Sequence, residues 1–170
     1  MVHADPFPLS RALLEAVLAD HISDRFVCAL VWRRLGYEPA EVDGRSEAPG
    51  GEAAEAEPPA PWRAGAATPP SWAEAFPRAP EVIAERAASV ALTRSVPTDH
   101  KQLLKQQLGF AGYRIGALYP RRTRRATAVN WLLAHLAERG ETLPESGPLP
   151  PLLEPPPDPR LGHPGDPPVV

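Results

Sequence analysis

The uneven distribution of proline is the feature that most limits how this chain folds. Of its 24 prolines, three fall in residues 1–40, eight in 41–80, two in 81–120 and eleven in 121–170. Each proline removes a backbone donor and fixes φ, so a proline-dense segment cannot form a helix or an inner strand. Folding is therefore restricted to roughly 1–40 and 72–140, about a hundred residues, which suffice for a single modest hydrophobic core.

Residues 1–40 predict an N-terminal pair of helices. Ser10 is a favoured N-cap residue, and the leucines before and after it form a hydrophobic staple. Ser23 caps a second helix with Asp24 in its first turn, and Gly36 ends that helix as its C′ residue. Because about two residues join the helices, we expect a tight αα-hairpin.

Residues 41–71 are predicted to be a disordered linker. Alanine, glutamate, glycine and proline dominate it, with six acidic residues against one arginine in 41–60. Such a segment buries too little apolar surface to offset its conformational entropy. Trp72 and Phe76 follow the linker, and we expect these large aromatic side chains to anchor the chain to the domain.

Residues 72–140 are expected to complete the same helical domain. The run 89–93 contains β-branched residues and favours a short strand, which would pair with the glycine-rich segment 109–119. A helix is predicted from about Thr98 to Leu108, and the last helix spans about 123–139 on an i, i+3, i+4, i+7 apolar pattern. The predicted fold class is mainly α: a small single domain of four or five helices with a minimal two-stranded β piece.

Residues 141–170 are predicted to be a disordered tail, because eleven of these thirty residues are proline. Pro148 and Pro151 have the PxxP spacing of a polyproline II ligand, which is the alternative role for the tail. Neither interpretation gives the tail a part in the core.

Several classes of protein are excluded by simple features. No apolar run approaches the roughly eighteen residues that span a bilayer, and residues 1–10 lack the basic-then-apolar order of a secretory signal. The single cysteine, Cys28, permits neither an intramolecular disulfide nor a Cys-rich zinc site, and its apolar neighbours predict a buried, unreactive thiol. We therefore expect a cytoplasmic protein with no membrane partner.

No catalytic constellation is evident in the sequence. The five histidines show no metal-ligand spacing, and the chain contains no GxGxxG, Walker or GxSxG pattern. Asp99 and His100 are adjacent, but neighbours on a helix point about 100° apart and would not face one substrate. We expect no enzymatic activity, no cofactor and no metal.

Basic residues concentrate in one stretch, although the net charge of the chain is only −3. Residues 86–137 hold nine lysines and arginines and a single acid, Asp99. Four of the arginines lie where the last helix begins, an end that already carries a partial positive charge. Each cation there lowers the stability of the helix by a few tenths to about one kcal/mol. The run is therefore better explained as an anion-binding site than as a stabilising feature.

The predicted anion- or partner-binding residues form one basic and aromatic group. They are Arg121, Arg122, Arg124, Arg125, Lys101, Lys105, Arg114, Tyr113 and Trp131. Arg121 and Arg125 are four apart and share a helix face, and Tyr113 offers a stacking surface. Nucleic-acid phosphate is the first candidate partner and an acidic protein surface is the second. A third interpretation pairs the arginines within the fold, with Glu81, Glu85 or the acidic segment 41–60, or leaves them solvated.

Several runs of the sequence carry a family resemblance. They are LTRS at 92–95, KQLL at 101–104, QLGF at 107–110, PRRTRRATAVNWLL at 120–133 and LVWRRLGY at 30–37. The chain resembles a family of cyanobacterial and plastid-lineage proteins known as domain of unknown function 1823, over about 9–37 and 72–136. The resemblance implies a cytoplasmic or stromal setting in a photosynthetic organism, and no mechanism.

The function predicted from the sequence is a non-catalytic binding module. Its arginine-rich helix N-terminus would engage an anionic partner, with nucleic acid as the first candidate. The alternative is an assembly factor that docks through Trp32, Tyr37 and the same arginines onto an acidic subunit of a larger, photosynthesis-related complex. Should residues 41–60 cover the arginines, they would compete with either partner.

Overall fold

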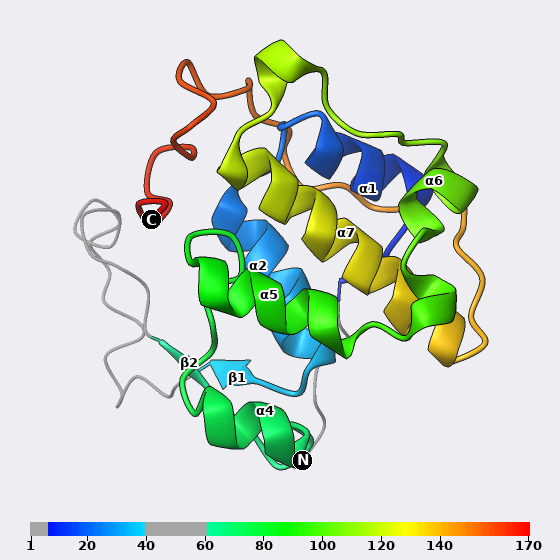
Figure 1. Ribbon diagram of the computed structural model, residues 1–170, viewed down its shortest axis with the longest axis vertical. Coiled ribbons are helices and arrows are strands. Elements are labelled where there is room, and N and C mark those ends of the chain that lie inside the picture. Colours follow the sequence, from blue (N-terminus) through cyan, green and yellow to red (C-terminus); the bar gives the residue numbers. More distant parts are fainter. Residues whose placement is uncertain (1–6, 40–60) are drawn as a thin grey trace. The chain divides into compact units, whose positions relative to one another are not determined.

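Helices dominate the computed structural model, which describes residues 7–39 and 61–170 (Figure 1). Within these residues there are six α-helices, two short 3₁₀ turns and one two-stranded antiparallel sheet. The predicted fold class, a small and mainly α domain with a minimal β piece, is confirmed, with six α-helices where four or five were expected. The prediction of disorder for 41–60 lies outside the described residues.

Residue contacts divide the chain into two compact units. One unit runs to Val31 and resumes with Glu81–Val170, and the other is Trp32–Pro80. The basic stretch, residues 86–137, lies entirely in the first unit. The first unit therefore positions the candidate site. Each unit is described by itself below.

The first two helices begin at the predicted caps. α1 (Arg11–Leu18) starts after Ser10, whose Oγ accepts a hydrogen bond from the Leu13 backbone N–H at 3.1 Å. α2 (Asp24–Arg34) starts after Ser23, whose Oγ accepts from the Phe26 backbone N–H at 3.2 Å. These local signals predicted both helix starts correctly, because a serine at the N-cap satisfies one of the free backbone donors.

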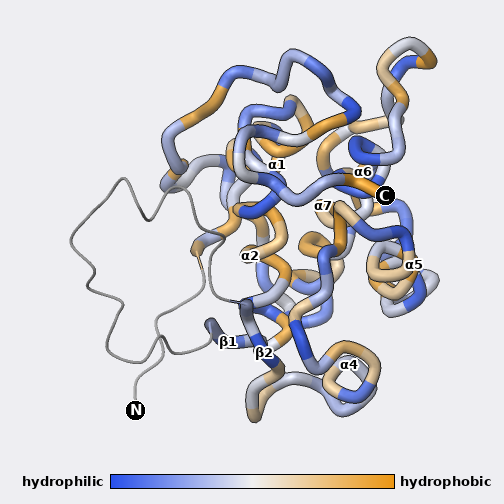
Figure 2. The backbone as a smooth tube through the Cα atoms, turned by 90° about the vertical axis from the view of Figure 1, so that its left-hand side faces the viewer, coloured by the Kyte–Doolittle hydropathy of each residue, from blue (hydrophilic) through white to orange (hydrophobic). Residues whose placement is uncertain are grey.

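The core of the first unit forms around α7 (Pro120–Glu138), which packs against α1, against α5 (Arg86–Ser95) and against α6 (Leu103–Leu108). Hydrophobic and hydrophilic colours alternate along these helices in the backbone tube of Figure 2, as expected for amphipathic elements. The fully buried side chains of α7 include Ala128, Val129, Leu132 and Leu133. α7 is therefore the element whose faces decide what each of its residues contacts.

The predicted strand at 89–93 is wrong, because this run belongs to α5. Ala88 and Leu92, four apart, are both fully buried, and burial of this helical stripe outweighs the β preference of one branched residue. Residues 109–119 consequently pair with no strand and contain only the 3₁₀ turn Ile115–Ala117.

The helix predicted over Thr98–Leu108 is interrupted. A 3₁₀ turn, Thr98–His100, precedes α6, and α6 ends at Gly109 in the left-handed region as expected. Asn130 of α7 causes the division: its Oδ1 accepts from the Leu104 backbone N–H and its Nδ2 donates to the His100 carbonyl, each at 3.0 Å. The side chain of Asn130 thus binds the backbone at the start of α6.

The second unit contains the sheet, formed by β1 (Glu38–Pro39) and β2 (Trp62–Arg63), followed by α4 (Pro70–Ala75). Part of the predicted linker, residues 61–71, is therefore ordered. Trp72 is buried in α4, and its ring lies 5.7 Å from that of the half-buried Phe76.

Gly36 makes a close approach possible in the second unit. Its φ is +85°, and a Cβ at this position would lie 2.6 Å from the backbone carbon of Ala67. Glycine accommodates both the left-handed conformation and this close contact. The predicted C′ glycine therefore also allows the backbone at Ala67 to lie against Gly36.

The C-terminal tail differs most from the prediction. It forms no helix or strand, but it runs past successive elements of the first unit (Figure 1, orange to red). Pro144 accepts a backbone hydrogen bond from Arg11, Leu153 donates to His21, and Val170 donates to Ala84. Proline prevents helices and strands in the tail, but its carbonyl oxygens can still accept hydrogen bonds. The tail is therefore ordered by contacts with the first unit although it contains no helix or strand.

Candidate functional site

The arginine run lies on the first two turns of α7. The helix begins at Pro120, three residues before the predicted start, since proline is favoured at the first helical position. Arg121 and Arg125 share one helix face, as expected from their spacing of four. That face points into the protein, and both side chains are fully buried.

Arg121 is held by two carboxylates. Its Nη1 and Nη2 donate to the two oxygens of Asp20 at 2.8 Å each, and its Nε donates to Asp24 Oδ2 at 2.9 Å. This fork geometry matches a guanidinium to a carboxylate with two parallel hydrogen bonds. The Pro159 carbonyl of the tail accepts a further bond from Nη1 at 3.3 Å.

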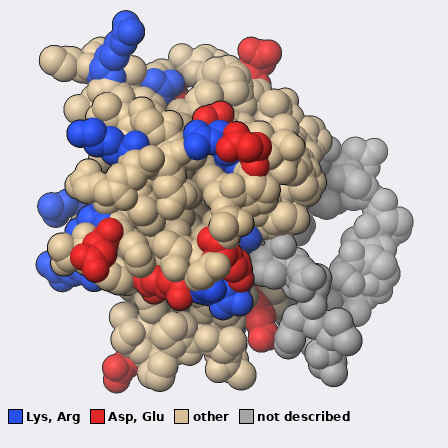
Figure 3. Space-filling view, turned by 90° about the vertical axis from the view of Figure 1, so that its right-hand side faces the viewer, with Lys and Arg blue, Asp and Glu red and all other residues tan. Residues whose placement is uncertain are grey.

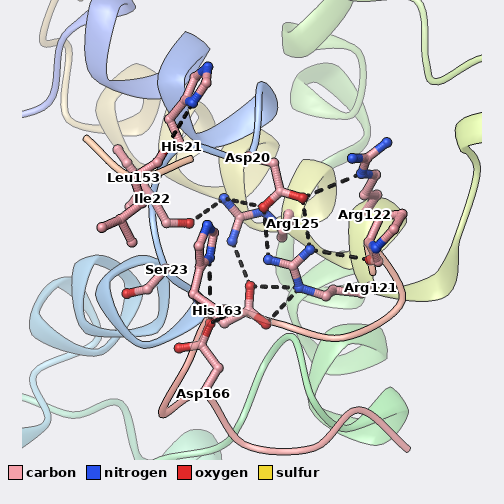
Figure 4. A network of polar contacts seen from close by, with 12 residues as sticks. Asp20, His21, Ile22, Ser23, Arg121, Arg122, Arg125, Leu153, His163 and Asp166 are labelled. Atoms are coloured by element: carbon pink, nitrogen blue, oxygen red, sulfur yellow. Dashed lines mark hydrogen bonds and ion pairs between the residues drawn. The ribbon is translucent and has the colours of Figure 1, made fainter. Parts of the chain in front are cut away.

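Arg125 completes the cluster (Figure 4). Its Nη1 donates to Asp24 Oδ1 at 2.6 Å, and its Nη2 donates to the carbonyls of Val17 and Ile22 at 2.9 and 2.6 Å. We call the four residues Asp20, Asp24, Arg121 and Arg125 the Arg–Asp network. Its two positive and two negative charges balance, and its arginines join the start of α7 to the turn between α1 and α2.

The backbone presents both acids to the arginines. Asp20 follows α1 with a φ of +70°, a left-handed conformation that aspartate tolerates better than most residues. Asp24 opens α2, and its backbone N–H donates to Asp166 Oδ2 at 2.9 Å. Asp166 also accepts from the Arg25 N–H, so a tail carboxylate caps α2 next to the network.

The surroundings of Asp20 favour its charged form. Burial alone would raise the pKa of Asp20, but the hydrogen bond from Arg121 and the charges of Arg125, Arg121 and Arg122 lower it below its usual value. Hydrogen bonds to Asp20 and Asp24 raise the pKa of the Arg121 guanidinium against the effect of burial. The prediction that Arg121 and Arg125 bind an external anion is therefore wrong: Asp20 and Asp24 already occupy them.

Arg122 and Tyr113 are largely used within the fold as well. The Arg122 guanidinium lies 5.7 Å from the Tyr113 ring centroid and 6.0 Å from that of Tyr119. Its Nε is 3.5 Å from Asp20 Oδ2. The Tyr113 hydroxyl donates to the Leu18 carbonyl at 3.0 Å, which fixes the ring and leaves it little freedom to stack on a partner.

Trp131 is a core residue and not a partner-binding one. It is only 8% exposed, its Nε1 donates to Ser95 Oγ at 3.0 Å, and its ring stacks on His135 at 5.5 Å. In the second unit, Trp32 and Tyr37 are also buried, with the Trp32 Nε1 donating to Pro80 and the Tyr37 hydroxyl donating to Phe76. The alternative docking surface built on Trp32 and Tyr37 is thus contradicted.

The remaining predicted residues lie at or near a surface groove. A cavity of about 560 Å³ opens between α5, α6 and α7, and its lining includes Lys101, Lys105, Phe110 and Asn130. A second cavity of about 540 Å³ lies between α5 and α7, and its lining includes Arg86, Arg124, Leu118 and Tyr119.

The two cavities form one groove. Three threonines, Thr93, Thr123 and Thr127, line both of them, so we treat the cavities together as the α5–α7 groove. Lys101 and Lys105 lie in one half and Arg86 and Arg124 in the other, and none of the described residues that line either half is acidic. Arg114 is exposed in the loop that follows Phe110.

Charges of both signs lie on the surface of the molecule. In the space-filling view, many lysine and arginine side chains lie along one edge of the visible face, but acidic side chains lie among them and basic ones also lie near its middle (Figure 3). Burial and the charge of Arg86 lower the pKa of Arg124, whose Nη1 donates to the main-chain oxygens of Ile83, Ala84 and Val170. Arg124 is therefore bound by main-chain oxygens in this part of the groove.

A metal site, an exposed cysteine and a membrane-spanning helix are all missing from the part of the chain that the structure describes. There, no three histidine, cysteine or acidic side chains lie close enough together to hold a metal ion. Cys28 is buried, and burial raises the pKa of its thiol, which confirms the expected unreactive cysteine. None of the described helices combines the length and apolarity needed to cross a membrane.

Sequence reasoning missed Asp20 and Asp24 as partners of the arginines. Asp24 had been assigned to its own helix N-terminus, and Asp20 had been given no role. One signal was available: the two acids are four residues apart, and so are Arg121 and Arg125. Equal spacing alone does not identify partners about a hundred residues away, so only the fold reveals the pairing.

Comparisons with known proteins place the fold but describe no activity. A family model described as a domain of unknown function (DUF1823) matches residues 8–137. A solved structure described as "Solution NMR structure of the protein" is 39% identical, with a TM-score of 0.59, over 79% of this chain and 98% of that chain. No curated protein matches the sequence. The family match ends before the C-terminal tail, so Pro159 and Asp166, which support the Arg–Asp network, lie outside it.

Proposed function

The chain belongs to the DUF1823 family, and we propose that it is a non-catalytic binding module whose α5–α7 groove holds an anionic partner. The observation that carries this proposal is the lining of the groove: Lys101 and Lys105 in one half, Arg86 and Arg124 in the other, and no acid among its described lining residues. A groove lined by one sign of charge concentrates ligands of the opposite sign.

The cations of the groove remain available to a ligand, unlike Arg121 and Arg125. Lys105 and Arg86 are exposed, and Lys101, although its Nζ donates to the Thr93 carbonyl at 2.7 Å, is also exposed. Because Arg124 lies near Arg86 without a carboxylate between them, an anion bound there would relieve their mutual repulsion. The basic stretch thus keeps a binding role on the groove side of α7.

This proposal places the site in the α5–α7 groove and not at Arg121 and Arg125, and it keeps an anionic partner. Nucleic acid and acidic protein segments are both anionic, and both were candidates from the sequence. The single buried cysteine suits a reducing compartment, so we propose the cytoplasm as the location.

Binding of two unrelated anionic probes tests the groove. We would titrate the protein into a labelled single-stranded oligonucleotide and a labelled glutamate-rich peptide at low salt, and follow fluorescence anisotropy. The variant Lys101→Glu/Lys105→Glu reverses two groove charges, and Arg139→Glu/Arg160→Glu reverses two exposed charges outside it. We expect the groove variant to lose at least about tenfold in affinity for whichever probe binds, and the control to lose far less.

Two results would contradict the proposal. One is that neither probe binds at any salt concentration. The other is that both variants weaken binding equally, which would show a response to net charge and no localised site.

A further inference from the structure

We propose that the partner held in the α5–α7 groove is an acidic amphipathic α-helix of another protein. This inference rests on the proposed function and names the class of partner. Three features of the groove support it: a floor of small side chains, an aliphatic rim that the described part of the chain leaves exposed, and cations at both ends.

The floor of the groove is built for close approach of a helix. Along α5, Arg86, Ser89 and Thr93 follow the spacing of one helix face, and along α7, Thr123, Thr127 and Asn130 do the same. The lining contributed by α5 and α7 includes the short side chains Ser89, Thr93, Thr123, Ala126 and Thr127, together with Val90. Small side chains lower the distance at which a third helix can pack into the groove between two others.

Leu118 is an exposed aliphatic side chain of the groove. It is 53% exposed and lines one half, and Ile115, three residues before it, is 94% exposed. Leu104, Phe110 and the buried Val96 line the other half. Exposed aliphatic side chains such as Leu118 and Ile115 are typical of a surface that a partner covers.

The charges lie at the two ends. Arg86 and Arg124 share a cavity with Pro120, the first residue of α7, whereas Lys101 and Lys105 share one with Asn130. The eleven residues from Pro120 to Asn130 span roughly 15 Å along the axis of α7, close to three helical turns. A partner helix of about that length would carry acidic residues at both ends and aliphatic residues on the face toward the threonines.

The N-termini of α5 and α7 add to the positive end. Arg86 is the first residue of α5 and Pro120 the first of α7, and both line the same cavity. Two helix dipoles therefore present their positive ends beside Arg86 and Arg124. Charge complementarity calls for acidic residues at the end of the partner helix that lies there.

The same lining fits a nucleic-acid strand less well. Bases stack on free aromatic faces, but the Phe110 ring lies edge-on to Tyr113 at 5.0 Å and the Tyr119 hydroxyl donates to Gly116. The sugar and phosphate groups of a bound strand would place polar atoms against the exposed aliphatic side chains, which would bury no apolar surface there. The observations therefore favour a protein helix, and nucleic acid becomes an outcome of the test.

Three labelled probes distinguish the partner classes. The first is an acidic peptide of about 15 residues, or four turns, of Glu, Ala and Leu with its leucines on one helix face. The second has the same composition with its leucines spread around the helix, and the third is a single-stranded oligonucleotide. We expect the amphipathic peptide to bind at least about tenfold more tightly than the rearranged one, because only it can bury its leucines.

A matched pair of variants locates the contact. Leu118→Asp places a charge on the groove rim, and Leu161→Asp places one on a leucine of similar exposure, 57%, outside the groove. Both positions are exposed, so both variants are expected to fold, which circular dichroism checks. We expect Leu118→Asp to weaken the amphipathic peptide at least about tenfold and Leu161→Asp to leave it unchanged.

Each remaining outcome overturns the inference in a recognisable way. Equal binding of the two peptides, or tight binding of the oligonucleotide alone, would leave the proposed anionic site standing and remove the helix as its partner. Equal effects of the two leucine variants would place the contact outside the groove. Failure of all three probes would remove the proposed function as well.

Discussion

Two faces of α7 use the same residue type for opposite purposes. On one face, Arg121 and Arg125 are fully buried and paired with Asp20 and Asp24. On the other face, Arg124 lines a groove with Thr123 and Thr127 and has carbonyl partners only. These residues lie within seven positions of each other, so their direction around the helix decides their role.

The difference shows why net charge along a sequence is a poor guide to a binding site. Buried ion pairs hold the fold together because their loss leaves an uncompensated charge away from water. Exposed cations contribute little to stability and remain free to attract a ligand. The basic stretch therefore contains buried arginines that hold the fold together and exposed cations that we propose as a surface for a partner.

Removal of Arg125 is expected to have the largest effect on stability. Arg125→Ala removes one donor from Asp24, which keeps its bond from Arg121, and the guanidinium donor from the carbonyls of Val17 and Ile22. Breaking a buried pair in this way costs about 3–5 kcal/mol of the free energy of unfolding. Urea denaturation of the variant and the wild type measures the loss.

Arg122→Ala provides the neighbouring control. Its side chain is 18% exposed and lies against tyrosine rings, so we expect a loss of no more than about 1 kcal/mol. Equal losses in the two variants would show that the Arg–Asp network is not distinct from the surface arginines.

The dependence of unfolding stability on acidic pH also separates the buried Arg–Asp network from the exposed charges. Because the folded protein lowers the pKa of Asp20, its contribution is present above the ordinary aspartate value of about 4 and is lost as pH falls through the folded pKa. Asp20→Asn should therefore be less stable than the wild type at neutral pH, and the difference should shrink below about pH 4. Urea midpoints measured from pH 7 to pH 3 test this.

Asp158→Asn serves as the control in the same buffers. Asp158 is exposed and bonds only to Arg160, so its variant should follow the wild-type curve. A stability difference for Asp20→Asn that stays constant with pH would contradict the assigned charge state.

The tail cap is expected to give the smallest of these effects. Asp166→Ala removes the acceptor for the Asp24 and Arg25 backbone N–H groups at the start of α2. Loss of an N-cap costs about 1 kcal/mol, with a range of roughly 0.5–2. Asp158→Ala, in the same tail, should leave the melting temperature unchanged, and an equal effect of both substitutions would mean that the tail does not cap α2.

Local signals in the sequence predicted local structure well. Ser10 and Ser23 start α1 and α2, and Gly36 and Gly109 adopt the left-handed conformation at helix ends. Each of these features depends on a few neighbouring residues, so propensity and capping chemistry are sufficient to predict it. The family resemblance is confirmed over a longer range than expected, while the cyanobacterial lineage stays a prediction.

Long-range structure could not be predicted in the same way. β1 and β2 pair across the acidic segment, and Asp20 meets Arg121 across about a hundred residues. The tail contributes Pro159 and Asp166 through backbone and side-chain bonds that composition does not encode. The sequence accordingly placed the candidate site on the buried face of α7, whereas the groove that we propose lies on another face of the same helix.

The most direct test of the account follows the arginine side chains during one titration. We would add the acidic amphipathic peptide to the isotope-labelled protein and record the Nε–Hε signals of its arginines by NMR. The account predicts that the signals of Arg86 and Arg124 shift with peptide concentration while those of Arg121 and Arg125 stay in place. Shifts centred on Arg121 and Arg125 would contradict it, because they would show that the anion enters the Arg–Asp network.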